Sequence, residues 1–386
     1  MRIGYDAKRI VRNGTGLGSY GRTLINSLSA VDTDDAFLLY APDKGRNDLR
    51  SQIVLRPNVT FHYPDNAHGG LKRALWRSHG IVKDLLHNKV DLYHGLSGEL
   101  PPGIHKAGIP TVVTIHDLIF LRHPEYYHWF DVQIYKWKFF QTLKEADHII
   151  AISECTKRDI LYYGDYPEEK ISVIYQSAAR RFTTTNTEED TTILQGLGNR
   201  YILQVGTLEE RKNALESMAA LGDLPDDIHL VLVGRQTPYT EQLLRYARQQ
   251  GLEPRLHILS GVSNDDLPVL YHHAACFVYP SRYEGFGIPI IEAIQCGLPV
   301  VAATGSCLEE AGGPDSLYVS PDDPHALAEA VLTMLNRPDR AEVIARSQEY
   351  VRRFENDSVA EEVKEVYRTI LKVPCPYRSG SCDHAR

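Results

Sequence analysis

The stretch CFVYPSRYEGFGIPIIEAIQCGLPVVAAT, residues 276–304, contains the pattern that decides the fold. Two short apolar runs lie at its ends, and a glycine-rich turn followed by a segment of helical periodicity lies between them. Short apolar runs bounded by turn residues are typical of strands that are covered on both faces. A strand, a turn, a helix and a second strand in this order predict two parallel neighbours in one sheet.

The same alternation continues along the whole chain of 386 residues. A first series of strand-like runs reads RIGYDA, AFLLYAP, VDLYHG, TVVTIHD and HIIAIS. A second series begins at Tyr201 and reads YILQVGT, HLVLVGR, LHILSGV, CFVYPS, PVVAAT and LYVSP. The polar, threonine-rich segment RRFTTTNTEEDTT between them is typical of a linker. The sequence therefore predicts an α/β protein with two Rossmann-like domains.

The expected parts of the chain follow from this pattern. A long, charged helical pattern at about 341–372 closes the second series. We expect an N-terminal Rossmann-like domain at 1–180, a linker at 181–198, a C-terminal Rossmann-like domain at 199–350, a C-terminal helix at 351–372 and a tail at 373–386.

Composition and charge favour a globular protein that does not bind nucleic acid. Hydrophobic residues make up 43% of the chain, the apolar runs are too short for a membrane span, and we expect no signal peptide after Met1. The net charge of −8 divides into +3 for the first 180 residues and −11 for the rest. Because neither half is strongly basic, nucleic acid is not an expected partner.

The cysteines and carboxylates do not predict a metal site or another cofactor. Three cysteines have apolar surroundings, and two lie in the polar tail without a second pair nearby: Cys155, Cys276, Cys296, Cys375 and Cys382. This usage favours the cytoplasm. Asp32-Thr33-Asp34 has the letters of a metal-diphosphate motif, but it precedes a strand, which favours a solvated turn.

The segment GTGLGSYG, residues 14–21, contains the letters of a dinucleotide fingerprint, with Asp43 about twenty residues further on. In that fingerprint the first glycine ends the strand directly, whereas here KRIVRN intervenes. We therefore interpret the segment as a flexible glycine loop that approaches a diphosphate, with Gly14 and Gly16 as contacts. An NAD-dependent oxidoreductase remains the alternative.

Other candidate residues follow the predicted strands, because open α/β sheets bind ligands beyond the carboxyl ends of their strands. Glu284 and Glu292 enclose a glycine turn and the start of a helix, where an anion can bind. Arg211 and Lys212 are adjacent cations that suit a diphosphate leaving group. His116 ends TVVTIHD and could hydrogen-bond a sugar. Each also has a plain alternative: a capping or solvated glutamate, a solvated cation pair, or a histidine bonded to local backbone.

Together these motifs resemble the retaining nucleotide-sugar glycosyltransferases of family 4. The motifs are GTGLGSYG, IHD at 115–117, VGTLEERKN at 205–213 and EGFGIPIIEA at 284–293. The resemblance implies the GT-B fold, two domains facing a cleft with the C-terminal helix packing back on the N-terminal domain. It implies that the domain at 1–180 is the acceptor-side domain and that the domain at 199–350 binds the nucleotide sugar. It also implies a front-face mechanism without a metal, in which the departing phosphate takes the acceptor proton. The opening Asp6-Ala7-Lys8 is most similar to bacterial mannosyltransferases of surface-polysaccharide assembly.

The resemblance also implies roles for individual residues. His116, Glu284, Arg211 and Lys212 are the implied catalytic residues. The implied donor-binding residues are Gly14, Gly16, Gly206, Thr207, Arg211, Lys212, Val262, Glu284, Gly285, Phe286, Gly287, Ile288 and Glu292. Glu292 is expected at the ribose and Val262 beside the base. Thr207 and Glu210 depart from the family, in which arginine and proline are frequent at these places.

A helical pattern at residues 71–86 could report on the acceptor. Leu71, Leu75, Val82 and Leu86 recur at helical spacing, and Lys72, Arg73, Trp76, Arg77 and Lys83 fall largely elsewhere. Such a basic surface suits peripheral contact with an anionic membrane or a lipid-diphosphate. A solvated face of an ordinary helix is the alternative.

The expected function is transfer of a hexose, with mannose from GDP-mannose as the leading donor, to a glycan or a lipid-linked glycan. A UDP-hexose is the nearest alternative donor. An NAD-binding oxidoreductase and a non-catalytic nucleotide-sugar-binding protein are alternatives of other classes.

Overall fold

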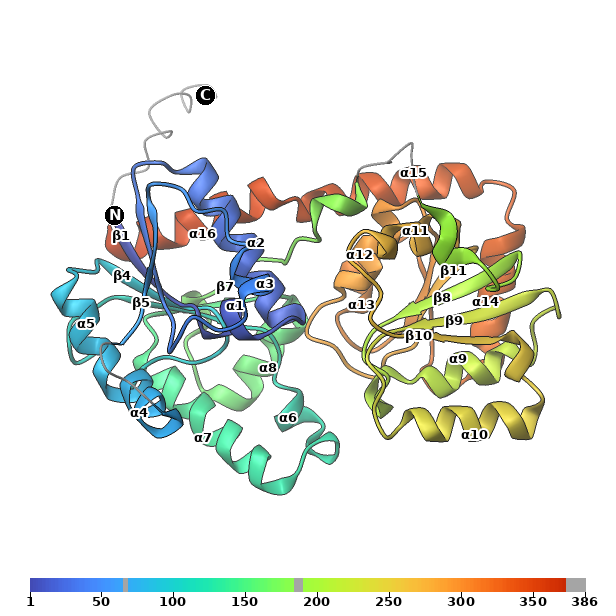
Figure 1. Ribbon diagram of the computed structural model, residues 1–386, viewed down its shortest axis with the longest axis horizontal. Coiled ribbons are helices and arrows are strands. Elements are labelled where there is room, and N and C mark those ends of the chain that lie inside the picture. The colour runs from blue at the N-terminus through green and yellow to red at the C-terminus, as the bar shows by residue number, and fades with distance from the viewer. Residues whose placement is uncertain (65–68, 184–189, 373–386) are drawn as a thin grey trace, which may run out of the picture. The chain divides into compact units, whose positions relative to one another are not determined.

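The computed structural model describes residues 1–64, 69–183 and 190–372, and Figure 1 shows its elements. The chain divides into two compact units. The first unit comprises Met1–Gln176 and the segment from Asn356, and the second comprises Ser177–Glu355. No described helix is long and apolar enough to cross a membrane.

The first unit is built on a parallel sheet of seven strands in the order β3-β2-β1-β4-β5-β6-β7. The strands are β1 (Arg2–Asp6), β2 (Ala36–Tyr40), β3 (Val59–His62), β4 (Leu92–Gly95), β5 (Thr111–Ile115), β6 (His148–Ala151) and β7 (Ile171–Val173). The helices are α1 (Lys8–Arg12), α2 (Gly16–Val31), α3 (Asn47–Arg50), α4 (Gly70–Leu75), α5 (Ile81–His87), α6 (Ile119–Arg122), α7 (Trp129–Glu145), α8 (Glu154–Gly164) and α16 (Asn356–Leu371). The expected parallel sheet is confirmed.

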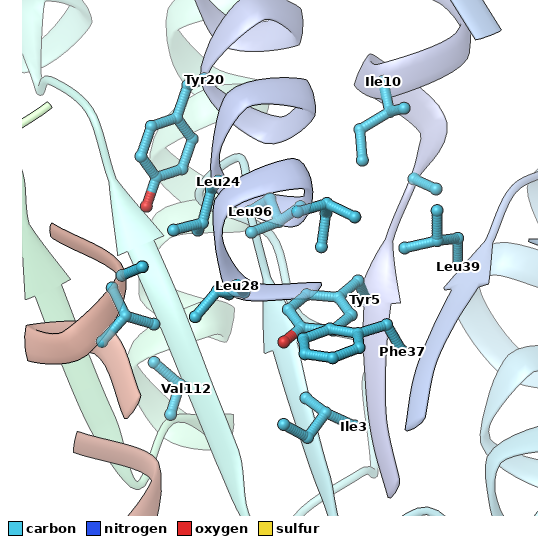
Figure 2. Packing of buried hydrophobic residues seen from close by; sticks show 14 of the residues in the cluster. Ile3, Tyr5, Ile10, Tyr20, Leu24, Leu28, Phe37, Leu39, Leu96 and Val112 are labelled. Carbon is cyan, nitrogen blue, oxygen red and sulfur yellow. The ribbon is translucent and has the colours of Figure 1, made fainter. Parts of the chain in front are cut away.

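Successive strand residues point to opposite faces of this sheet, and helices cover both faces. Tyr5 and Phe37 stack with ring centroids 5.9 Å apart, in the core formed with α2 and α16 (Figure 2). Leu38 and Tyr40 belong to the other core, which includes residues of α5, α7 and α8. Burial on both faces explains why these strands appear as continuous apolar runs.

The C-terminal helix packs on the first unit, as expected. The pattern at 341–372 is not one helix, however. It forms α15 (Arg340–Val351), a short 3₁₀ turn at Arg352–Phe354, and α16. Val363 and Tyr367 of α16 are buried in the core that includes α2. The break falls where the chain leaves the second unit, between Glu355 and Asn356.

The second unit contains a parallel sheet of six strands in the order β10-β9-β8-β11-β12-β13. The strands are β8 (Arg200–Val205), β9 (Ile228–Val233), β10 (Leu256–Leu259), β11 (Cys276–Tyr279), β12 (Val300–Ala303) and β13 (Leu317–Val319). The remaining helices are α9 (Ala214–Leu221), α10 (Thr240–Gln250), α11 (Asp266–His273), α12 (Ile288–Gln295), α13 (Leu308–Gly312), α14 (Pro324–Asn336) and α15. The opening stretch, residues 276–304, forms β11, α12 and β12, as its pattern predicts.

The glycine segment is more ordered than expected. Gly16–Val31 is the helix α2, so Gly16, Gly18 and Gly21 are helical, and α1 occupies the preceding KRIVR. A Cβ at Gly18 would lie 1.9 Å from the carbonyl oxygen of Asn13, so the tight turn between α1 and α2 requires glycine there. The expectation of a flexible loop is wrong, because the spacing of the glycines serves helix packing.

Candidate donor site in the second unit

The candidate site lies where the strand order of the second sheet reverses. β8 and β11 are neighbours, and the chain leaves them toward opposite edges of the sheet. Such a switch point is where open α/β sheets bind ligands. The loop after β8 carries Arg211 and Lys212, and the loop after β11 carries Glu284. The fold therefore brings Glu284 to the adjacent Arg211 and Lys212, although Lys212 and Glu284 are 72 positions apart in the sequence.

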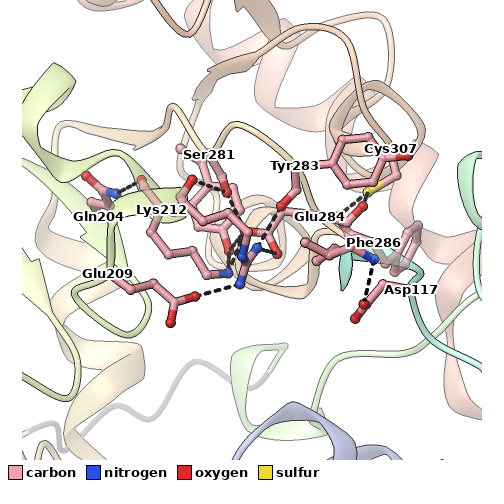
Figure 3. Close-up of polar contacts among 12 residues, drawn as sticks. Asp117, Gln204, Glu209, Lys212, Ser281, Tyr283, Glu284, Phe286 and Cys307 are labelled. Carbon is pink, nitrogen blue, oxygen red and sulfur yellow. Dashed lines mark hydrogen bonds and ion pairs between the residues drawn. The ribbon is translucent and has the colours of Figure 1, made fainter. Parts of the chain in front are cut away.

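Glu284 lies between the two cations (Figure 3). Its carboxylate oxygens are 2.9 Å from Nη1 of Arg211 and 2.5 Å from Nζ of Lys212. The Ser281 hydroxyl donates a further hydrogen bond to the same carboxylate. Burial alone would raise the pKa of Glu284, but the charges of Arg211 and Lys212 outweigh burial and lower it to about 2. Glu284 is therefore ionised at any physiological pH, and it holds both cations in place.

Backbone contacts fix the position of the cations. Arg211 donates a hydrogen bond of 2.6 Å to the carbonyl oxygen of Tyr283. Asn213 follows in the left-handed conformation, with φ of 56°, and its amide donates to the carbonyl oxygens of Pro280 and Pro321. The Gln204 amide donates to the carbonyl oxygen of Lys212. The loops after β8 and β11 are thus joined, and the cations are oriented without a ligand.

Two further side chains complete this polar cluster. Glu209 forms an ion pair of 2.7 Å with Arg211, and its side chain is 38% exposed. The Tyr279 hydroxyl accepts a hydrogen bond of 2.8 Å from Lys212. Sequence reasoning missed Glu209, Ser281 and Tyr279. Their positions offered a weak signal, because Tyr279 ends β11 and Ser281 and Glu209 lie within three residues of Glu284 and Arg211.

Glu292 lies apart from this cluster. Helix α12 begins at Ile288, so Glu284 lies in the preceding loop and Glu292 lies in the helix. Its carboxylate accepts a hydrogen bond of 3.0 Å from the Tyr271 hydroxyl of α11. Burial raises the pKa of Glu292 to about 7, although the Tyr271 bond and the charge of Arg181 act in the other direction. Glu292 can therefore change its charge near neutral pH.

The turn before α12 is shaped by packing. Gly287 precedes the helix, and a Cβ there would lie 2.8 Å from that of Ala311. Phe286 is buried, with its ring 5.3 Å from that of Phe354. Gly285 and Ile288 are half-buried beside it. Of the other expected donor-binding residues in this unit, Gly206 and Thr207 follow β8 directly, and Val262 is half-buried after β10.

In the first unit, the expected site residues are His116, Gly14 and Gly16. Nε2 of His116 donates to the carbonyl oxygen of Leu96 at 2.8 Å, and Nδ1 accepts from the Gln176 amide at 2.6 Å. Burial lowers the pKa of His116 to about 4, so the ring is neutral. Because both ring nitrogens have protein partners, a bond to a sugar requires one of them to be given up. Gly14 and Gly16 are exposed, and no atom lies within 4 Å of a Cβ built on Gly16.

The helix expected at 71–86 is present, but the side chains that it buries and exposes differ from those that the sequence predicts. Leu75 and Leu86 are exposed, whereas Ile81 and Leu85 are buried. Arg77 points into the unit and pairs with two carboxylates, so the expectation that it belongs to a basic surface is wrong. Residues 76–80 form a π-helix, which shifts the helical phase and exchanges the faces. The side chain of Leu71 lies outside the part that the structure describes.

Among the described residues, cysteines and carboxylates do not gather into a metal site. Within residues 1–64, 69–183 and 190–372, no three or more His, Cys, Asp or Glu side chains are grouped so that they could hold a metal ion. Cys155, Cys276 and Cys307 are buried, and Cys296 is half-buried. Cys375 and Cys382 lie outside the described residues.

The fold with two parallel sheets is shared with known GT-B proteins. The chain is similar to the structure of sucrose-phosphate synthase from Thermosynechococcus elongatus, with a TM-score of 0.76, 20% identity, and coverage of 97% of this chain and 100% of that one. It is also similar to Anabaena HepE in complex with UDP-glucose, with a TM-score of 0.73, 19% identity, and coverage of 96% and 100%. The architecture is that of the GT-B class.

Family models and relatives agree with the fold. The model "Glycosyltransferase Family 4" matches residues 15–177, and "Glycosyl transferases group 1" matches residues 186–351. O-antigen chain mannosyltransferase B of Escherichia coli is 29% identical, covering 96% of this chain and 100% of its own. O-antigen chain mannosyltransferase RfbU of Salmonella typhimurium is 29% identical, with coverage of 93% and 97%. The chain belongs to the group 1, family 4 glycosyltransferases, a family of retaining hexosyltransferases.

Proposed function

We propose that this enzyme transfers mannose from GDP-mannose to a glycan or lipid-linked glycan in the cytoplasm, with retention at the anomeric carbon. The observation that carries the donor site is the pair Arg211 and Lys212, held by the buried Glu284 at the switch point of the second sheet. The names of the two O-antigen relatives support mannose. The UDP-glucose bound to HepE makes a UDP-hexose the second candidate donor.

The cation pair explains how the leaving group is stabilised. When the bond from the anomeric carbon to the diphosphate oxygen breaks, negative charge grows on the diphosphate. Arg211 and Lys212 are already oriented, so they stabilise this charge more than they stabilise the bound substrate. The diphosphate replaces Glu209 at Arg211, because Glu209 is the more exposed of the two carboxylates that pair with it. Glu284 stays behind as the fixed counter-charge.

The acceptor reacts on the same face that the diphosphate leaves. The acceptor oxygen bonds to the anomeric carbon, the anomeric carbon–oxygen bond to the diphosphate breaks, and the acceptor proton passes to the departing phosphate oxygen. This path needs no protein base, which agrees with a neutral His116 whose nitrogens are already bonded. His116 is proposed to lie beside the transferred sugar. Glu292 is proposed to accept hydrogen bonds from the ribose hydroxyls when it is ionised.

A nucleotide screen tests the donor class. Thermal shifts are measured with GDP, UDP, ADP, dTDP and NAD, and the matching nucleotide sugar is then tested for transfer. GDP is expected to give the largest rise in Tm, because a ligand that binds only the folded state stabilises it. A rise with NAD alone would favour the oxidoreductase and overturn the proposal.

Two variants test the residue roles. Lys212→Ala and Glu292→Ala are each expected to lower turnover by at least about tenfold, which is about 1.4 kcal/mol of transition-state stabilisation. Glu210→Ala is the matched control, because Glu210 is exposed in the same loop as Lys212. Near-normal turnover in both variants would contradict the assignment.

A further inference from the structure

A pocket of about 270 Å³ lies within the first unit, at the switch point of its own sheet. β1 and β4 are neighbours there, and the chain leaves them toward opposite edges. Asp6 ends β1 and Glu99 follows β4, and both line the pocket. Helices α5 and α7 supply further walls through Ile81 and Trp137. The pocket therefore occupies the place in this sheet that the cation cluster occupies in the other.

One wall of the pocket carries four paired charges. Arg77 lies between two carboxylates, with Nη2 3.2 Å from Asp6 and 3.1 Å from Glu99. Lys138 pairs with the other oxygen of Glu99 at 2.9 Å. Burial alone would raise the pKa of Glu99, but Arg77 and Lys138 outweigh it and lower the pKa to about 2. The four charges balance, so this wall presents hydrogen-bonding groups without a net charge.

An aromatic ring and two prolines make another part of the pocket lining apolar. Trp137 of α7 lines the pocket, yet 58% of its surface is exposed. Pro101 and Pro102 lie in the same lining, and Gln141, one helical turn beyond Trp137, adds an amide. A large aromatic surface that stays exposed beside fixed polar groups is suited to a ligand with both apolar and hydroxyl-bearing faces.

We propose that this pocket binds the terminal sugar of the acceptor, a neutral saccharide unit. This assignment rests on the proposed function, because it names the acceptor subsite of the same enzyme. A phosphate is disfavoured because it would lie beside two carboxylates whose cations are already paired. An aliphatic ligand would leave buried charges without solvent or new partners. Sugar hydroxyls can bond to the remaining lone pairs of Asp6 and Glu99, and the sugar C–H face can cover Trp137.

The three tryptophans of the chain offer a direct readout. In the double variant Trp76→Phe/Trp129→Phe, Trp137 is the sole source of tryptophan fluorescence. Methyl α-mannoside and methyl α-glucoside are titrated into this variant, with glycerol as the polyol control. A saturating change with at least one glycoside, and none with glycerol, is the expected result. A linear, glycerol-like response to both glycosides would overturn the proposal.

Kinetics with a matched pair give the second test. Trp137→Ala is expected to raise the KM for the acceptor by about tenfold and to leave the KM for the donor within about twofold. Trp129→Ala removes the same side chain from the same helix, and Trp129 does not line the pocket, so its acceptor KM should not change. Equal effects of the two variants would contradict the pocket assignment.

The two proposals fail separately. If GDP still raises Tm while the glycosides give no saturating change, the pocket assignment is wrong and the donor site stands. If the glycosides bind while no nucleoside diphosphate raises Tm, the proposed function is wrong and the pocket remains a saccharide site.

Discussion

The two sheets place ion clusters of opposite arrangement at their switch points. In the second unit one carboxylate, Glu284, lies between Arg211 and Lys212. In the first unit one guanidinium, that of Arg77, lies between Asp6 and Glu99. The same topology thus supports a cation pair suited to a diphosphate in one unit and a charge-balanced wall suited to a neutral sugar in the other. What a switch point binds is decided by the side chains after its strands.

Removing the central carboxylate of the second unit should have the largest effect. Glu284→Ala leaves two largely buried cations without their shared partner, and we expect a loss of about 4 kcal/mol in the free energy of unfolding. Urea denaturation measures this loss. Glu210→Ala, in the same loop but exposed, should change stability little. Equal stability of the two variants would show that Glu284 does not organise the cluster.

Removing the central cation of the first unit should have a smaller effect. Arg77→Met leaves Asp6 and Glu99 with less compensation, but Lys138 remains and the side chain of Arg77 is partly exposed. We expect a loss of about 2 kcal/mol, measured in the same way. Arg73→Met, in the adjoining helix α4, is the control, because its partner Asp43 forms a second ion pair with Arg12. A greater loss in Arg73→Met would contradict the inward position of Arg77.

Much of this contrast was predictable from the sequence, and part of it was not. Apolar runs covered on both faces predicted the parallel sheets, and strand ends predicted Arg211, Lys212 and Glu284. The strands β3 and β7 were missed because they are short edge strands with half-exposed residues. The role of Arg77 was missed because a π-helix at residues 76–80 breaks the period of 3.6 residues on which the face assignment depended. Loop paths, which bring Ser281 and Glu209 to the cluster, have no periodic signal.

The raised pKa of Glu292 predicts that GDP affinity at the proposed donor site depends on pH. Below about pH 7 Glu292 is neutral, and above it the carboxylate can accept from two ribose hydroxyls. GDP affinity should therefore rise by about tenfold from pH 6 to pH 8. Titration of the phosphate itself contributes in every variant, so Glu292→Gln is the control and should show a smaller rise. Identical pH profiles would contradict contact between Glu292 and the ribose.

The same group makes a contribution to stability that changes with pH in the opposite direction. The folded state holds the Glu292 proton up to about pH 7, whereas an unfolded chain releases it near 4.5. Its contribution to stability is therefore complete below about pH 4.5 and is lost as the pH rises to about 7. Wild-type and Glu292→Gln unfolding curves at pH 5 and pH 8 measure this difference. If the wild type instead became more stable relative to Glu292→Gln as the pH rises, this prediction would be wrong.

The smallest expected effect concerns Glu209, the carboxylate that is proposed to compete with a diphosphate for Arg211. Glu209→Gln removes a partly exposed carboxylate that, under the proposed function, a diphosphate displaces, so GDP affinity should increase by about threefold. Saccharide binding in the first unit should stay unchanged. Weaker GDP binding would show that Glu209 supports the donor site instead of competing for it.

The most direct test of the division between the two switch points is a calorimetric titration with GDP. Wild type, Lys212→Ala and Trp137→Ala are compared under one set of conditions, with UDP and ADP beside GDP. The account predicts that Lys212→Ala weakens nucleoside diphosphate binding by at least about tenfold and that Trp137→Ala leaves it unchanged. Equal affinity in Lys212→Ala and wild type, or a loss confined to Trp137→Ala, would contradict it.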